Sequence, residues 1–230
     1  MIPLRVRAHL RGQIALPKGP PALDSLLIAL TCERDGIEPP ATPQLARRDI
    51  EIPIAKEPAG RFHLASFGVF VPERFENRFV NRRFPIDVAQ DWGERALRRV
   101  QINSGLNKSF RVPMETMHVA GDVVLWFCVG EPEAVRALLS FCTSLGKRRG
   151  VGIGRVRAWE VEPIEPWEGF PCVYKGQALR PLPVDWPGLV APRTAMRVLS
   201  PPYTDKLREE PLAVPSWWTE ARQPPSLEPC

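Results

Sequence analysis

Glycine and positive charge are concentrated in the stretch from Ser144 to Trp159, which reads SLGKRRGVGIGRVRAW. The stretch holds four glycines and five basic residues, and it contains no carboxylate. Glycine lets a backbone approach a ligand closely, and cations neutralise an extended chain of phosphates. We therefore expect phosphate contacts from this loop, at Gly146, Lys147, Arg148, Arg149, Gly150, Gly152, Gly154 and Arg155.

The alternative for this stretch is a solvated turn in which Gly146 only ends a helix. One helix end does not require the three further glycines, so we favour phosphate binding. Two nucleotide-binding loops are excluded. A dinucleotide-binding loop leads from a strand into a helix, whereas this stretch leaves a predicted helix and enters a predicted strand. A P-loop lysine is followed by Ser or Thr, and Lys147 is followed by arginine.

Few residues offer acid–base or metal chemistry. The histidines are His9, His63 and His118, and the tyrosines are Tyr174 and Tyr203. Cleavage of RNA through its 2′-hydroxyl needs a general base, a general acid and a cation, and a sheet could pair His9 with His63. The carboxylates and the five cysteines are scattered, without a C-x-x-C pair. We expect no catalytic residue, no metal site and no cofactor.

Composition limits the class of protein. With 230 residues, 44% of them hydrophobic, the chain can bury the core of one domain with an appendage. The formal charge of +5 is compatible with a polyanionic partner. No apolar run reaches the length of a membrane span, and arginines interrupt the apolar residues near the N-terminus. We expect a cytoplasmic protein that does not bind membranes.

Hydrophobic periodicity predicts alternating strands and helices. In residues 3–16, apolar and basic residues alternate as in a strand with one buried face. The unbroken apolar run DVVLWFCV at 122–129 is typical of a central strand. Residues 22–36 and 131–146 each carry an apolar stripe and end in glycine, which predicts helices. Further strands are predicted at 50–55, 61–71 and 155–164.

This order predicts an α+β fold with the ferredoxin-like βαββαβ plan, an antiparallel sheet with both helices on one face. We assign residues 1–165 to that domain. Residues 166–230 form an irregular Pro/Trp-rich extension packed on the core through Trp167, Trp186, Trp217 and Trp218, and YKG at Tyr174 could turn a hairpin. Residues 72–113 read as an inserted, partly mobile lobe.

The predicted insertion is rich in arginine with phenylalanines between. We expect phosphate contacts there, from Arg78, Arg82, Arg83, Lys108 and Arg111 among others. Phe75, Phe79 and Phe84 would either stack on unpaired bases or pack the lobe onto its own domain. Arg5, Arg7 and Arg11 of the first strand form either a further RNA-binding face or a solvated surface with acidic neighbours.

The loop pattern G-x-x-R-G-x-G-x-G, between a second helix and a final strand, resembles that of the RAMP superfamily of CRISPR-associated proteins. The matching residues are Gly146, Arg149, Gly150, Gly152 and Gly154. The long insertion and irregular C-terminal segment are most similar to the Cas-five group. The opening PLRVRAHLRGQIALPKGPPALDSLLIAL and the loop SLGKRRGVGIGRV resemble the corresponding subunit of type IV effector complexes.

The resemblance implies a non-catalytic subunit that holds the 5′ repeat-derived handle of the crRNA and caps the foot of the backbone filament. It implies a backbone RAMP subunit as partner, contacted by residues 72–113 as a thumb, with target DNA and a helicase reached through the complex. A metal-independent crRNA-processing endonuclease is the alternative within the superfamily. A basic binding module unrelated to CRISPR is the alternative outside it.

Overall fold

The computed structural model describes residues 1–16, 21–37, 50–82, 110–147, 152–203 and 205–215. The chain divides into two compact units. One comprises Met1–Arg74 with Met117–Cys230, and the other comprises Phe75–Thr116. The described elements are helices and mostly antiparallel strands, which confirms the predicted α+β class.

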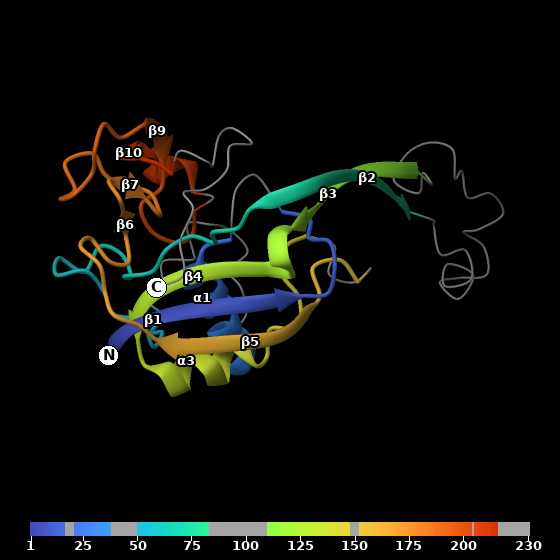
Figure 1. Ribbon diagram of the computed structural model, residues 1–230, viewed down its shortest axis with the longest axis horizontal. Coiled ribbons are helices and arrows are strands. Elements are labelled where there is room, and N and C mark those ends of the chain that lie inside the picture. The colour runs from blue at the N-terminus through green and yellow to red at the C-terminus, as the bar shows by residue number, and fades with distance from the viewer. Residues whose placement is uncertain (17–20, 38–49, 83–109, 148–151, 204, 216–230) are drawn as a thin grey trace, which may run out of the picture. The chain divides into compact units, whose positions relative to one another are not determined.

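A three-stranded antiparallel sheet forms the centre of the larger unit (Figure 1). β1 (Ile2–Leu10) lies between β4 (Val123–Gly130) and β5 (Val156–Pro163). Val6 is opposite both Trp126 of β4 and Val161 of β5. All three strands were predicted. The first ends at Leu10 rather than at residue 16, because the chain bends at residues 11 and 12, where Gly12 has a φ of 84°.

The prediction of a regular strand at 61–71 is wrong, because these residues form only isolated bridges. Ala65 and Val69 form isolated bridges to β4. On the side facing away from β4, the N–H groups of Phe67 and Gly68 donate to the carbonyls of Leu179 and Pro21. This segment is therefore an edge covered by two loops instead of by another strand. Residues 50–55 are likewise reduced to a bridge between Ile54 and Gly130.

Two α-helices in the described part of the chain accompany the sheet. α1 (Leu23–Arg34) was predicted, whereas α3 (Pro132–Leu139) ends seven residues before the predicted stop at residue 146. The chain turns after Leu139 and becomes extended, so that Ser144 pairs with Arg155. No helix in the part of the chain that the structure describes is long and apolar enough to span a membrane.

The hydrophobic core lies on one face of the sheet. Leu4, Val6 and Ala8 of β1 are fully buried there and share one cluster with Leu27 of α1 and Leu139 of α3. Both helices therefore cover the same face. The predicted alternation of β1 is confirmed, because Arg5 and Arg7 lie on the opposite face.

The described ends of the predicted insertion are regular. β2 (Pro72–Arg82) and β3 (Phe110–Val119) pair as a two-stranded ribbon (Figure 1). A 3₁₀ turn (Ala120–Asp122) joins β3 to β4. No strands were assigned to these residues from the sequence.

The described residues after 165, which we call the C-terminal part, are more regular than the sequence predicted. β6 (Val173–Tyr174) and β7 (Gln177–Ala178) form the hairpin predicted at YKG, with φ of 47° at Lys175 and 78° at Gly176. A second sheet has the order β8 (Leu182–Pro183), β10 (Glu210–Ala213), β9 (Thr194–Arg197). Trp186 packs against a hydrophobic cluster that includes Leu182 and Leu212 of this sheet, and Trp167 packs against a separate cluster that includes Phe127 of β4. Trp217 and Trp218 lie outside the described residues.

Candidate nucleic-acid interface

The glycine loop, residues 146–154, closes a short antiparallel pairing. The N–H of Leu145 donates to the carbonyl of Gly154 at 2.8 Å, and the N–H of Val156 donates to that of Thr143 at 2.9 Å. The loop therefore connects the extended chain after α3 to the start of β5, which agrees with its predicted place between a helix and the final strand.

The segment after β1 holds the base of this loop. The N–H of Lys147 donates to the carbonyl of Ala15 at 2.7 Å, and the N–H of Gly154 donates to that of Gln13 at 2.8 Å. The N–H of Arg11 donates to the carbonyl of Arg155 at 2.8 Å. Arg11 is thereby brought beside the loop, which the sequence did not predict.

The glycines of the loop have different surroundings. Gly146 and Gly154 have φ of 81° and 70°, and a Cβ would lie 2.2 Å from the Ala15 carbonyl oxygen at the first and 1.9 Å from that of Leu145 at the second. These two glycines permit close contact of the backbone with the protein itself. Gly152 has a φ of 82°, but nothing lies within 4 Å of its Cβ position.

Four cations surround the base of the loop. Arg11, Lys147, Arg155 and Arg157 are exposed. None of them forms an ion pair with another residue in the described ranges. We call these four residues the loop cations. Arg148, Arg149 and Gly150 lie outside the described residues. The loop cations present positive charge to solvent without a counter-ion among the residues that the structure describes, which suits a phosphate-binding surface.

The arginines on the open face of the sheet are neutralised instead. Arg5 lies 2.9 Å from Glu162, and Arg7 lies 3.1 Å from Glu160 and 3.0 Å from Glu162. His9 Nε2 lies 3.0 Å from Glu160 Oε1. Hydrogen bonds from His9 and Arg7 lower the pKa of Glu160. Of the two readings left open for Arg5 and Arg7, the structure favours the surface with acidic neighbours.

The predicted contact residues of the insertion are placed only in part. Arg78 is exposed, with its Nε 4.0 Å from Glu76. Arg82 and Arg111 lie in β2 and β3, but their side chains are outside the description, as are Arg83, Lys108 and Phe84 altogether. Phe75 and Phe79 are 47% and 54% exposed. Four residues apart in one strand, they lie on the same face of the ribbon.

A family model for the CRISPR type IV associated protein Csf3 matches residues 54–215, more than half of the chain. The protein belongs to the Csf3 family. No curated protein matches the chain. Family membership confirms the resemblance to a type IV CRISPR-associated subunit, and it makes the other components of such a complex the expected partners.

In this Csf3-family chain, His9 and His63 do not pair across the sheet. His9 is opposite Val123 at one end of β4, whereas Leu64 is hydrogen-bonded to Val129 at the other. Six residues of strand separate these positions by about 20 Å. His118 Nε2 lies 2.8 Å from the Gln13 side-chain amide.

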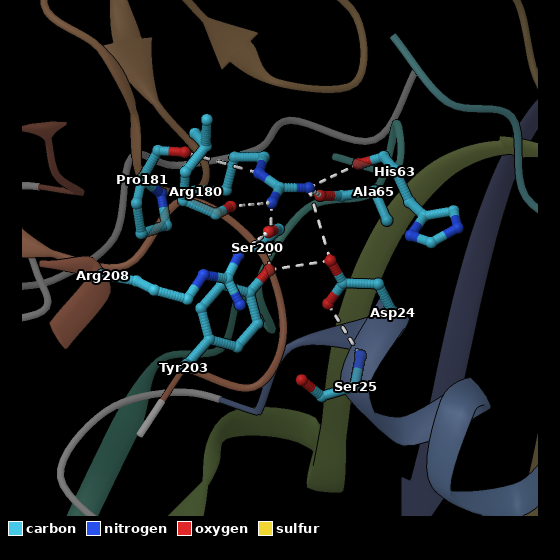
Figure 2. Close-up of polar contacts among 10 residues, drawn as sticks. Asp24, Ser25, His63, Ala65, Arg180, Pro181, Ser200, Tyr203 and Arg208 are labelled. Atoms are coloured by element: carbon cyan, nitrogen blue, oxygen red, sulfur yellow. Dashed lines mark hydrogen bonds and ion pairs between the residues drawn. The ribbon is translucent and has the colours of Figure 1, made fainter. Parts of the chain in front are cut away.

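A buried ionic cluster in this chain was missed by the sequence analysis (Figure 2). Arg180 is 0% exposed and Asp24 1%. An Arg180 Nη2–H donates to Tyr203 Oη at 2.9 Å, and the Tyr203 hydroxyl donates to Asp24 Oδ2 at 2.7 Å. Arg180 Nη1 lies 3.5 Å from the same carboxylate oxygen. The only signal in the sequence was an arginine set among the apolar residues Leu179, Pro181 and Leu182.

The guanidinium of Arg180 also binds backbone from separate segments. It donates to the carbonyls of His63, Ala65 and Leu199, and its carbon lies 4.4 Å from the centre of the Phe62 ring. The cluster therefore joins the start of α1, the edge segment after residue 61 and the C-terminal part. The polar groups of Arg180, Tyr203 and Asp24 bond to one another and to backbone, which indicates a structural role.

The electrostatics of the cluster are those of a charged pair bridged by a neutral phenol. Burial disfavours the charge of Arg180, but Tyr203 and Asp24 raise the pKa of Arg180 above its ordinary value. Burial and the Asp24 charge raise the pKa of Tyr203 well above its ordinary value, despite the opposing effect of Arg180. Tyr203 therefore stays protonated and donates to the carboxylate.

Proposed function

We propose that this protein binds the guide RNA of a type IV CRISPR complex, with the loop cations as its phosphate-binding surface. The observation that carries the proposal is the contrast between the two ends of β1. Arg5 and Arg7 have acidic partners at 2.9 to 3.1 Å. Arg11, Lys147 and Arg155 have no ion pair in the described ranges and converge on one loop. Arg148 and Arg149 extend this surface in sequence.

The arrangement of the strands supports a ferredoxin-like, RAMP-type fold. The bridged segment at 64–69, β4, β1 and β5 lie side by side in that order. In the βαββαβ plan these are the second, third, first and fourth strands, the order that two crossing βαβ connections produce. We propose this fold because both helices cover the same face.

Within such a complex we propose that the bound segment is the 5′ repeat-derived handle, and that the subunit caps the foot of the backbone filament. The exposed Phe75 and Phe79 of the ribbon would stack on bases or contact the neighbouring backbone subunit. The proposal is for binding without cleavage. It is supported by the separation of His9 from His63.

The test of RNA binding is the salt dependence of the affinity. The full chain, with its own CRISPR repeat RNA, is titrated between about 50 and 200 mM salt, beside the variant Lys147→Gln/Arg155→Gln. We expect weaker binding by the variant. The slope of log affinity against log salt should also be smaller by roughly 0.7 for each phosphate that the variant no longer neutralises.

The matched control is Lys175→Gln/Lys206→Gln, which removes the same charge from two exposed positions in the C-terminal part. If both double variants bind with the same slope, the loop cations are not the phosphate site. The same reactions, run with EDTA on denaturing gels, report on cleavage. We expect intact RNA, and a discrete cut that disappears in His9→Ala would replace the proposal with the endonuclease.

A further inference from the structure

A shallow groove in the C-terminal part is not explained by RNA binding. Its volume is about 450 Å³. Arg61, Arg208, Glu209 and Glu210 bring charge to it, and Leu199, Ser200 and Leu207 complete the lining. Two arginines and two glutamates balance each other. This groove therefore differs from the glycine loop, whose sequence contains no carboxylate.

Leu207 projects from the wall of this groove into solvent. It is 80% exposed, the most exposed of the large apolar side chains in the described part of the chain. Its backbone is nevertheless held in place, since its N–H donates to the Asp205 carboxylate at 3.1 Å, and Asp205 is buried. A leucine presented on a held 3₁₀ turn loses little conformational entropy when it is buried by a partner.

The two arginines of the groove are engaged within the chain. Arg208 donates to the hydroxyl of Ser200 at 2.6 Å (Figure 2). It also donates to the carbonyl of Pro201 at 3.1 Å. Arg61 Nε donates to Glu57 at 2.9 Å. Burial opposes the charge of Glu57, but the N–H groups of Ala59 and Arg61 and the Arg61 guanidinium keep its pKa below the ordinary value. Arg61 therefore has an ionised acceptor.

The two glutamates have no such partner. Glu209 and Glu210 are exposed, and neither makes an ion pair with a residue that the structure describes. Apolar surface continues beside them. Glu210 is opposite Arg197, and the next cross-strand pair, Pro211 with Met196, is exposed. Arg208 and Arg197 keep the charge of this surface balanced, so the exposed apolar side chains beside the carboxylates are the feature that suits a polypeptide.

We propose that this groove is a docking surface for a protein subunit of the type IV complex. The partner presents a basic side chain to Glu209 and Glu210, and an apolar pocket that covers Leu207. The exposed apolar side chains of Leu207 and Met196, together with the two carboxylates, favour a polypeptide over RNA. The inference rests on membership of the Csf3 family and holds whether or not the loop cations bind RNA.

The test is co-expression of the full chain with the other subunits of its own type IV complex, followed by affinity purification through a tag on this chain. The variants are Leu207→Ser and Glu209→Lys/Glu210→Lys. We expect each to weaken the association with one subunit by roughly tenfold or more, because the first removes a buried anchor and the second removes a paired charge. Affinity for repeat RNA should not fall in either variant, because neither removes a cation.

The matched control is Glu165→Lys/Glu168→Lys, which reverses two exposed carboxylates elsewhere in the larger unit. It should leave the association intact. Unchanged recovery of every subunit with both groove variants would overturn the proposal. Loss of RNA affinity in the groove variants with the subunits retained would also overturn it, and would make the groove a nucleic-acid site. The far-UV CD spectrum of each variant checks that it is folded.

Discussion

At the scale of single residues, the position of Arg180 shows that charge and exposure are separate properties. Burying a guanidinium is costly unless its donors are satisfied. Here four carbonyls, a phenol and a carboxylate surround it. The cluster is coupled, because removal of Arg180 leaves Asp24 as a buried charge with only Tyr203 and the Ser25 N–H as donors.

We predict that Arg180→Met lowers the free energy of unfolding by about 3–5 kcal/mol, the usual cost of breaking a buried ion pair. Tyr203→Phe should cost about 1–3 kcal/mol, because it removes one bridging hydroxyl. Urea unfolding followed by tryptophan fluorescence measures both. Arg208→Met is the control, since that side chain is partly exposed. Equal losses in Arg180→Met and Arg208→Met would contradict the structural role of the cluster.

At the scale of elements, the glycine loop depends on contacts between backbones. Gly146 lies against Ala15, and Gly154 lies against Leu145, at distances that leave no room for a Cβ. Neither glycine ends a helix, because α3 stops at Leu139. The loop is therefore held at both ends by contacts with the rest of the chain. Among the described glycines of the loop, Gly152 has open space at its Cβ position.

We predict that Gly154→Ala destabilises the protein by about 2 kcal/mol more than Gly152→Ala does. Both positions have a positive φ, so they share the backbone strain of about 1–2 kcal/mol that an L-residue suffers there. The difference isolates the contact with Leu145. Urea unfolding of the two variants measures it. If the two free energies are the same, the close backbone packing at Gly154 is not important for stability.

At the scale of the whole molecule, the C-terminal part is built into the larger compact unit. Phe127 of β4 packs against Trp167 and Phe170, with ring centres 4.8 Å and 6.2 Å apart. The N–H of Phe67 donates to Leu179. Removal of the residues after 165 would expose this face of β4 and leave the N–H of Phe67 in the edge segment without its acceptor.

We predict that a chain ending at residue 165 does not unfold cooperatively and is degraded rapidly by trypsin. The control is a deletion of residues 75–116, joined by a short Gly-Ser linker, because these residues form a compact unit of their own. That variant should keep a cooperative thermal transition. A cooperative transition in the chain ending at 165 would show that the C-terminal part is dispensable for folding.

Much of the fold was accessible from local pattern. The alternation in β1, the apolar run of β4 and the stripe of α1 each depend on residues adjacent in sequence, and these elements were predicted. The Lys-Gly pair at 175 and 176 favours a tight turn by itself. The end of α3 was not predicted, because Cys142 and Leu145 continue the apolar stripe although they are buried from an extended chain.

The sequence alone determined that this chain has an antiparallel α+β core and a glycine-rich cationic loop, since period and composition are local properties. Only the tertiary structure decided which cations have partners. Arg5 meets Glu162 across 157 positions of sequence, and Tyr203 meets Asp24 across 179. Arg180 bonds to Tyr203 and pairs with Asp24 at the same place. Strand register and long-range packing set these distances, and they left the cations at the glycine loop without an acidic partner in the described part of the chain.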